Sequence, residues 1–273
     1  MIEANALCFA YSGRKKSVLE NVDWAISGGE FEAIVGPNGC GKTTLLRLLA
    51  GELSPLSGHI QLKGKRLGDY PSAELAQHRS VLTQSPRLDF DFSVREVVLM
   101  GRSPFLATTS HSENLAAIDA ALKALDLEHF AHRIYPELSR GEKQRVQLAR
   151  VLAQLNTKDP KQGLLLLDEP INHLDIAHQH LTLGLAREKA DAGHAVVAVL
   201  HDLNLALQYA SRVTVLHEAS VYAQGVPADI FDQACLARVF QIKGERIVDS
   251  AGNPYIRTHG LVQDTTLNER DSS

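Results

Sequence analysis

The residues with the clearest chemistry in this sequence form a glycine-rich loop at positions 36–44, GPNGCGKTT. The loop matches the pattern G-x-x-x-x-G-K-[ST] at every specified position. Its glycines allow consecutive backbone N–H groups to point toward one centre, where the positive end of a following helix adds to the attraction for anions. Lys42 can reach terminal phosphates, and the Thr43 hydroxyl can bind a magnesium ion that bridges them. The loop therefore predicts a site for a polyphosphate with its metal ion.

Two adjacent carboxylates are the second chemical feature. The run 164–169, LLLLDE, is typical of a buried strand that ends in Asp168 and Glu169. Open parallel sheets bind their ligands at this edge. Asp168 can hold magnesium, and Glu169 can orient or deprotonate an attacking water, which contributes roughly 10²–10⁴ in rate. Because buried acids are costly without a nearby cation, the pair favours phosphoryl transfer to water over a structural role.

Two further polar residues follow predicted strands. Gln84 comes after the apolar run 80–83, and His201 comes after the apolar run 195–200. Gln84 can contact the metal ion and the water, and His201 can hydrogen-bond the terminal phosphate. A single histidine at a strand end is usually structural, so the role of His201 depends on the other motifs. Asp202 is expected to cap the helix that follows.

The elements around the loop place it between a strand and a helix. Residues 31–35, FEAIV, form a short apolar run, and Leu45, Leu48 and Leu49 recur at helical spacing. This pattern argues against a glycine-rich turn that only joins two elements. Thr44 is expected to support the loop.

Alternating apolar residues in segment 2–30 predict an antiparallel hairpin, and segment 57–64 predicts another. Tyr11 continues the alternation of Leu7 and Phe9 in the first strand of the first hairpin, upstream of the phosphate loop. An aromatic ring there can stack on a nucleotide base, a contact worth about 1–3 kcal/mol. The alternative is a strand residue that packs on the sheet, which the residues alone favour.

The middle of the chain changes to helical runs at 94–102, 114–125 and 142–155, separated by prolines. We therefore expect a helical subdomain inserted into a strand-rich core. The predicted organisation is a single domain of residues 1–262, with a core of about 1–71 and 158–262, a helical subdomain of about 72–157, and a flexible polar tail at 263–273.

Composition limits the class of protein. The 273 residues are 44% hydrophobic and 22% charged, as in a soluble globular protein, and no apolar run approaches the roughly 18 residues that cross a bilayer. The net charge of −4 argues against broad nucleic-acid binding. The sequence has an acidic residue near its start, where a secretory signal carries basic ones, and it has an odd number of cysteines. Both features predict a protein of the cytoplasm, where thiols stay reduced.

Histidines and cysteines give two smaller expectations. His178 and His180 are two positions apart on a predicted helix and do not share a face, so they are interpreted as surface or packing residues and not as a metal site. Cys40 lies near Lys42 and a predicted helix N-terminus, and both features lower a thiol pKa. Cys40 is therefore expected to react with alkylating agents faster than Cys8 or Cys235, with protection by bound nucleotide.

The order of these motifs resembles that of the ATP-binding-cassette ATPases over nearly the whole chain. The matching segments are 36–44 for Walker A, Gln84 for the Q-loop, 138–145 (LSRGEKQR) for the signature, 164–169 for Walker B, 172–175 (NHLD) for the D-loop, His201 for the switch histidine and Tyr11 for the adenine-stacking aromatic. The resemblance implies the α/β P-loop NTPase fold of this type, a mixed sheet core with an antiparallel β subdomain and an inserted helical subdomain. It also implies ATP and Mg²⁺ as cofactors.

The resemblance assigns site residues by position. The implied catalytic residues are Glu169, His201 and Gln84, and the implied metal ligands are Thr43, Gln84 and Asp168. The implied nucleotide-binding residues are Tyr11, Gly36, Pro37, Asn38, Gly39, Cys40, Gly41, Lys42, Thr43, Thr44, Ser139, Gly141 and Asp175.

Members of this family work as dimers, in which the Walker A of one subunit and the signature of the other enclose each ATP. The resemblance therefore implies that Ser139 and Gly141 serve the nucleotide of a second copy. It also implies separate membrane permease subunits, which receive force through the helical subdomain around Gln84 to Pro104.

Segments 94–104 and 201–206 resemble importers of iron-siderophores, cobalamin and haem, and segments 147–155 and 175–180 look most like haem importer ATPases. The implied setting is the cytoplasmic face of a bacterial inner membrane, with a periplasmic haem-binding protein as an indirect partner. The alternatives are siderophore or cobalamin cargo, a soluble ATPase of this family without a membrane partner, and a module that binds ATP without turnover.

The sequence departs from the family pattern at three places. Arg140 replaces the second signature glycine, Ile171 replaces the threonine usual after Glu-Pro, and Ala219 and Ser220 stand where a hairpin glycine is common. We expect Arg140 to be tolerated, with Ser139 and Gly141 making the main contacts. The other two departures are expected to alter packing and turn geometry.

Overall fold

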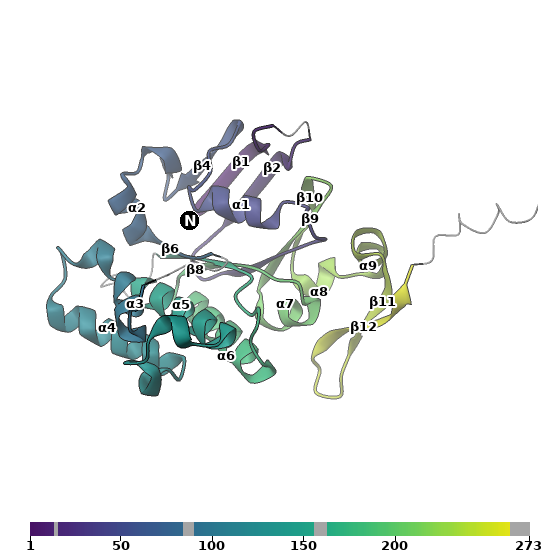
Figure 1. Ribbon diagram of the computed structural model, residues 1–273. Helices are drawn as coiled ribbons and strands as arrows, with labels where there is room; N and C mark the ends of the chain where they lie inside the picture. Colours follow the sequence, from purple (N-terminus) through teal and green to yellow (C-terminus); the bar gives the residue numbers. More distant parts are fainter. Residues whose placement is uncertain (14–15, 84–89, 156–162, 263–273) are drawn as a thin grey trace, which may run out of the picture.

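The computed structural model describes residues 1–13, 16–83, 90–155 and 163–262 (Figure 1). A six-stranded sheet with the order β10-β9-β3-β8-β7-β6 forms its centre. The strands are β3 (Phe31–Val35), β6 (Arg79–Leu82), β7 (Leu164–Asp168), β8 (Ala195–Val199), β9 (Arg212–His217) and β10 (Ser220–Gly225). All neighbours pair in parallel except β9 and β10. The expected mixed sheet is confirmed.

The central strands are apolar throughout because both faces of the sheet are covered. In β7, Leu164 and Leu166 pack with the antiparallel sheet and α1 (Lys42–Leu49), whereas Leu165 and Leu167 pack with the helical side. The helices on that side include α6 (Ile176–Asp191) and α7 (Leu203–Tyr209). Two cores therefore fix the sheet from opposite faces.

The expected N-terminal hairpins form a second, antiparallel sheet with the order β2-β1-β4-β5. Its strands are β1 (Ile2–Phe9), β2 (Leu19–Ile26), β4 (Ser57–Leu62) and β5 (Lys65–Arg66). Helix α1 lies between this sheet and the central sheet (Figure 1). At the β9–β10 hairpin, Glu218 and Ala219 both have positive φ, at 48° and 66°, a geometry that usually selects glycine. Because glycine is absent here, two residues with side chains adopt a left-handed backbone conformation that is unfavourable for them.

Helices pack together in the middle of the chain. They are α2 (Ser72–His78), α3 (Val94–Met100), α4 (His111–Ala124) and α5 (Arg140–Leu155), with short 3₁₀ turns at Leu67–Asp69, Ser103–Phe105, Glu128–Phe130 and Tyr135–Glu137. Helices α3, α4 and α5 contact one another. Strand β6 lies within the expected helical segment, yet it pairs with β7 of the central sheet. The division into core and helical subdomain stays a prediction.

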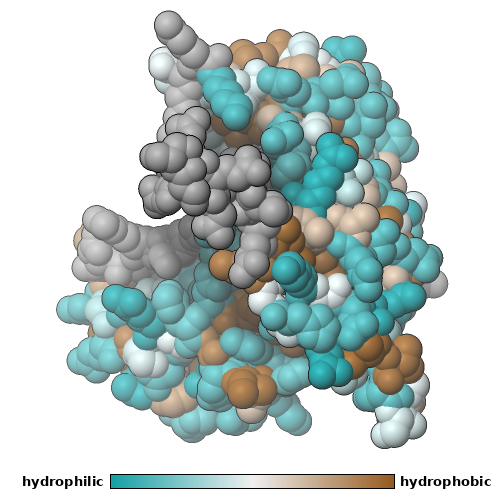
Figure 2. Space-filling view, turned by 90° about the vertical axis from the view of Figure 1, so that its right-hand side faces the viewer, coloured by the Kyte–Doolittle hydropathy of each residue, from teal (hydrophilic) through white to brown (hydrophobic). Residues whose placement is uncertain are grey.

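The C-terminal part contains a hairpin that the sequence did not indicate. After α8 (Pro227–Ile230) and α9 (Gln233–Phe240), β11 (Ile242–Val248) and β12 (Pro254–Leu261) form an antiparallel hairpin. Strand β11 packs on α9, and β12 packs on α7. Figure 2 shows a face on which hydrophilic side chains predominate and apolar ones form separate groups. Within the described ranges, no helix has both the length and the apolarity to cross a membrane.

A buried carboxylate joins the two sheets. Glu32 of β3 is fully buried and accepts hydrogen bonds from Trp24 Nε1, at 2.8 Å, and from the Thr214 hydroxyl. Arg212 Nε lies 3.5 Å from its second oxygen. Burial raises the pKa of Glu32, although these three partners oppose the shift. The charged form is therefore less favourable here than in the unfolded chain.

We predict that Glu32→Gln changes the pH dependence of stability. A raised pKa means that the contribution of Glu32 is complete below its ordinary pKa of 4.5 and is lost as pH rises through the folded value. Relative to Glu32→Gln, the parent chain should lose free energy of unfolding as pH increases from about 4.5 toward neutrality. Urea unfolding of both proteins across this range provides the measurement. Parallel pH profiles would contradict the prediction.

Candidate functional site

The phosphate loop, residues 36–44, joins β3 to α1 as the sequence predicted. Glycine is required at two of its positions. A Cβ on Gly36 would lie 2.2 Å from the carbonyl oxygen of Leu216 in β9. Gly41 has a φ of 106°, and a Cβ there would lie 2.8 Å from the Leu19 side chain. The loop is therefore wedged between β9 and the start of β2.

A cation and an oxygen ligand from the loop meet a second oxygen ligand, at the end of β7, at one edge of the sheet. Lys42 is 5% exposed, and its Nζ donates to the carbonyl oxygens of Gly36 at 2.8 Å and Pro37 at 2.9 Å. The Thr43 hydroxyl donates to Asp168 Oδ1 at 3.1 Å. Mg²⁺ in phosphate sites takes one or two protein oxygen ligands and the substrate phosphates, so this donor pair fits magnesium.

Asp168 is nearly fully buried, and burial raises the pKa of its carboxyl. The Thr43 hydrogen bond opposes this shift, whereas the charge of Glu169 adds to it. A cation held by Asp168 would favour the ionised form. The described residues contain no cluster of three or more histidine, cysteine or acidic side chains that would hold a metal without the phosphates.

Glu169 and His201 meet at the ends of β7 and β8. Glu169 Oε1 lies 2.6 Å from His201 Nε2, and a carboxylate only accepts, so the imidazole N–H donates. The Asn172 side chain donates to Glu169 Oε2. Glu169 has a φ of 49°, and Gln144 Nε2 donates to the Pro170 carbonyl at 3.1 Å next to it. The carboxylate is thus held on both oxygens.

Sequence reasoning missed the contacts of Asn172 and Gln144. Asn172 was included only as part of the D-loop motif, and no local pattern assigns its amide to Glu169. Gln84, the third implied catalytic residue, lies outside the described residues. Its contacts with metal and water stay a prediction.

Tyr11 is anchored by its hydroxyl. The Tyr11 and Thr44 hydroxyl groups lie 3.2 Å apart, and the ring packs edge-on against Phe9 with centroids 5.0 Å apart. Thr44 is buried, so this contact ties the ring to the start of α1. Stacking of Tyr11 on a base stays a prediction, compatible with its partly exposed ring.

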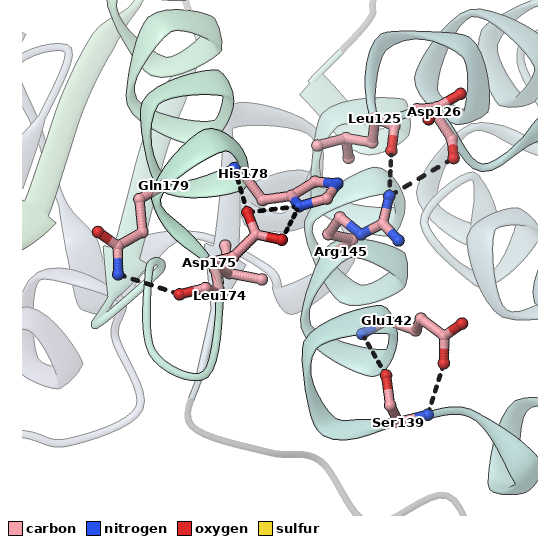
Figure 3. Close-up of polar contacts among 9 residues, drawn as sticks. All are labelled: Leu125, Asp126, Ser139, Glu142, Arg145, Leu174, Asp175, His178 and Gln179. Carbon is pink, nitrogen blue, oxygen red and sulfur yellow. Dashed lines mark hydrogen bonds and ion pairs between the residues drawn. The ribbon is translucent and has the colours of Figure 1, made fainter.

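The signature residues begin helix α5 (Figure 3). The Ser139 N–H donates to Glu142 Oε2 at 2.7 Å, and the Glu142 N–H donates to Ser139 Oγ at 3.3 Å. This reciprocal capping lowers the pKa of Glu142. Arg140 forms the first residue of α5 and has no positive φ, so arginine costs no left-handed strain in place of glycine.

Asp175 caps the N-terminus of helix α6 in the same region (Figure 3). It accepts from the His178 N–H at 2.9 Å and lies 2.8 Å from His178 Nδ1, contacts that lower the pKa of Asp175. A Cβ on Gly141 would lie 2.9 Å from the His173 carbonyl, so the signature and D-loop of this chain are in close approach.

A cavity of about 480 Å³ borders the phosphate loop. Its walls include Val18, Gly39, Ala219, Phe240 and Gln241. Phe240 is the last residue of α9, and Gln241 follows it directly. The cavity provides room beside the loop for the remainder of a phosphate-bearing ligand.

Comparison with known proteins agrees with this geometry. Residues 19–172 match the ABC transporter family. The chain is 43% identical to the hemin import ATP-binding protein HmuV of Rhodopseudomonas palustris over 257 residues, which cover 93% of each chain. It is 48% identical to the protein of the same name from Gloeobacter violaceus over 228 residues, 83% of this chain and 82% of that one.

Solved structures of ABC transporter cassettes share the fold of this chain. A metal-chelate type ABC transporter in an inward-facing conformation superposes with a TM-score of 0.76 at 26% identity, covering 95% of this chain and 97% of that one. A dimeric ATP-binding cassette bound to ADP and Pi superposes with a TM-score of 0.72 at 26% identity, covering 83% and 99%. This chain belongs to the ABC transporter family, as one of its ATP-hydrolysing cassettes.

The structure corrects the expectation for Cys40. Cys40 is 8% exposed, and burial raises the pKa of its thiol despite the charge of Lys42. Cys235 is buried as well, and burial raises its pKa to about 11. Cys8 is only half-buried, and hydrogen bonds from Ser57 and from the Asn21 N–H lower its pKa.

We therefore predict that Cys8 reacts first with iodoacetamide at neutral pH, because the thiolate is the reacting form. Mass-spectrometric mapping of a time course gives the order. Saturating Mg-ATP should leave the Cys8 rate unchanged, which provides an internal control. Faster labelling of Cys40 than of Cys8 would refute the order.

Proposed function

We propose that this chain is the ATP-hydrolysing subunit of a bacterial importer that carries hemin across the inner membrane. The hydrogen-bonded Glu169–His201 pair beside Asp168 and Thr43 carries the proposal for hydrolysis. Similarity to hemin import proteins over 93% of the chain supports the cargo.

The proposed reaction uses groups at the ends of three neighbouring strands. Lys42 and the loop N–H groups neutralise the phosphates, and bound magnesium, held by Thr43 and Asp168, supplies further positive charge there. Glu169 orients the attacking water and accepts its proton. His201 donates to the terminal phosphate or to Glu169, according to which acceptor is nearer. Asn172 keeps Glu169 facing the reacting atoms.

A second copy completes the site in this proposal. Ser139 hydrogen-bonds within its own helix turn and leaves its side chain exposed at the end of α5. Ser139 and Gly141 are proposed to contact the nucleotide bound by the partner. A dimeric structure of a related cassette bound to ADP and Pi supports this arrangement.

The membrane subunits are proposed to dock beside α3. A cleft of about 360 Å³ opens between β6, α3 and α5, and its lining includes Glu52, Arg79, Met100 and Arg150. In this arrangement, ATP binding and hydrolysis would move α3 relative to the central sheet, and the permease docked beside α3 would move with it. A periplasmic haem-binding protein would deliver cargo to the permease, and the chain would act on the cytoplasmic face.

We expect Glu169→Gln to retain ATP binding and to lower turnover by roughly 10²–10⁴, because phosphate contacts survive while the proton acceptor is lost. Phosphate release and nucleotide binding measure the two effects separately. Lys42→Ala is the matched control, since it should weaken ATP binding itself. Turnover by Glu169→Gln at the parental rate would refute the assignment of the base.

Cargo is tested by purifying the chain with the membrane protein that accompanies it and reconstituting both in vesicles with the binding protein. ATP-dependent uptake of hemin, absent with Glu169→Gln, is the expected result. Uptake of cobalamin or of a ferric siderophore in place of hemin would show that the importer carries that cargo instead. ATP turnover without any associated membrane protein would favour the soluble alternative.

A further inference from the structure

His201 lies two residues before helix α7. His201 immediately precedes Asp202, whose carboxylate caps α7 by accepting from the Asn204 and Leu205 N–H groups at 2.8 and 3.0 Å. The helix has only seven residues. Short helices have little stability of their own and depend on tertiary contacts. The position of His201 therefore depends on what holds α7.

One side chain of α7 hydrogen-bonds to the β11–β12 hairpin. Asn204 Oδ1 accepts from the Ile256 N–H at 2.7 Å, and Asn204 Nδ2 donates to the Ile256 carbonyl at 3.3 Å. One amide thus satisfies both backbone groups of a β12 residue, as a neighbouring strand would. Ile256 itself is 5% exposed in the main core. Helix α7 packs against β12 more extensively than against any other described element.

The far end of α7 has a second polar anchor. The Tyr209 hydroxyl lies 2.7 Å from His180 Nδ1 of α6. Asn204 lies near the His201 end, whereas Tyr209 is the last residue of the helix. Loss of the Asn204 contact would therefore remove the polar anchor nearer His201, while the anchor at Tyr209 stays in place.

We propose that Asn204 is a positioning residue for ATP hydrolysis, which acts by joining α7 to the C-terminal hairpin and so keeps His201 within hydrogen-bond distance of Glu169. The inference rests on the proposed function of that pair. The 2.6 Å contact between His201 and Glu169 is short, so a small displacement of α7 would break it. Misplacement of a reacting group by about 1 Å can cost as much as 10²-fold in rate.

The test measures ATP turnover by the full chain, with magnesium, for Asn204→Ala, His201→Ala and the double variant. Asn204→Ala should lower kcat by about tenfold and leave KM for ATP unchanged. In the His201→Ala background, Asn204→Ala should add less than about a twofold effect, because the contact that it positions is already gone. Asn204→Asp keeps the acceptor for the Ile256 N–H and should fall between the parent and Asn204→Ala.

Asn253→Ala is the matched control. Asn253 belongs to the same hairpin, and its side chain bonds to Asp249 at the turn and not to α7. Its kcat should equal that of the parent. Parental kcat in Asn204→Ala, or effects of Asn204→Ala and His201→Ala that multiply, would overturn the positioning inference while the parent still hydrolyses ATP. No hydrolysis by the parent would instead refute the proposed function on which the inference rests.

Discussion

The site depends on the register of three parallel strands. Val199 of β8 pairs with Ile34 of β3 on one side and with Asp168 of β7 on the other. The chain leaves each strand within a residue or two of this row, so the phosphate loop, Glu169 and His201 emerge side by side. A shift of one residue in any strand would turn its side chains to the opposite face and separate these groups.

Burial of this sheet fixes the strand register, and it also makes charged side chains within the sheet unfavourable. Every residue of β3, β7 and β8 is buried, which fixes the register through two cores. The same burial raises the pKa of Asp168 and of Glu32, because charge is poorly solvated there. At Asp168 the penalty is useful, since a carboxylate in such a place favours a bound cation. At Glu32 the hydroxyl and indole donors oppose the effect of burial without cancelling it.

Motifs whose role follows from residues adjacent in the sequence were predictable. The phosphate loop, the paired acids, His201 and the strands that carry them lie where residue patterns placed them. Effects of packing were not predictable. The lysine beside Cys40 indicated a reactive thiol, yet burial by elements distant in sequence reverses the pKa shift. The β11–β12 hairpin was not predictable because its partly exposed strands mix charged with apolar residues, and its contacts with α7 include an amide, that of Asn204, which is distant in the sequence.

In the proposed function, the aligned strand ends form an ATPase centre that only a second copy completes. ATP turnover per chain, measured against chain concentration with sedimentation of the same samples, tests it most directly. Turnover per chain should rise with the fraction of paired chains and approach zero where the chain is monomeric. Equal turnover per chain in monomeric and paired samples, or no turnover at any concentration, would contradict it.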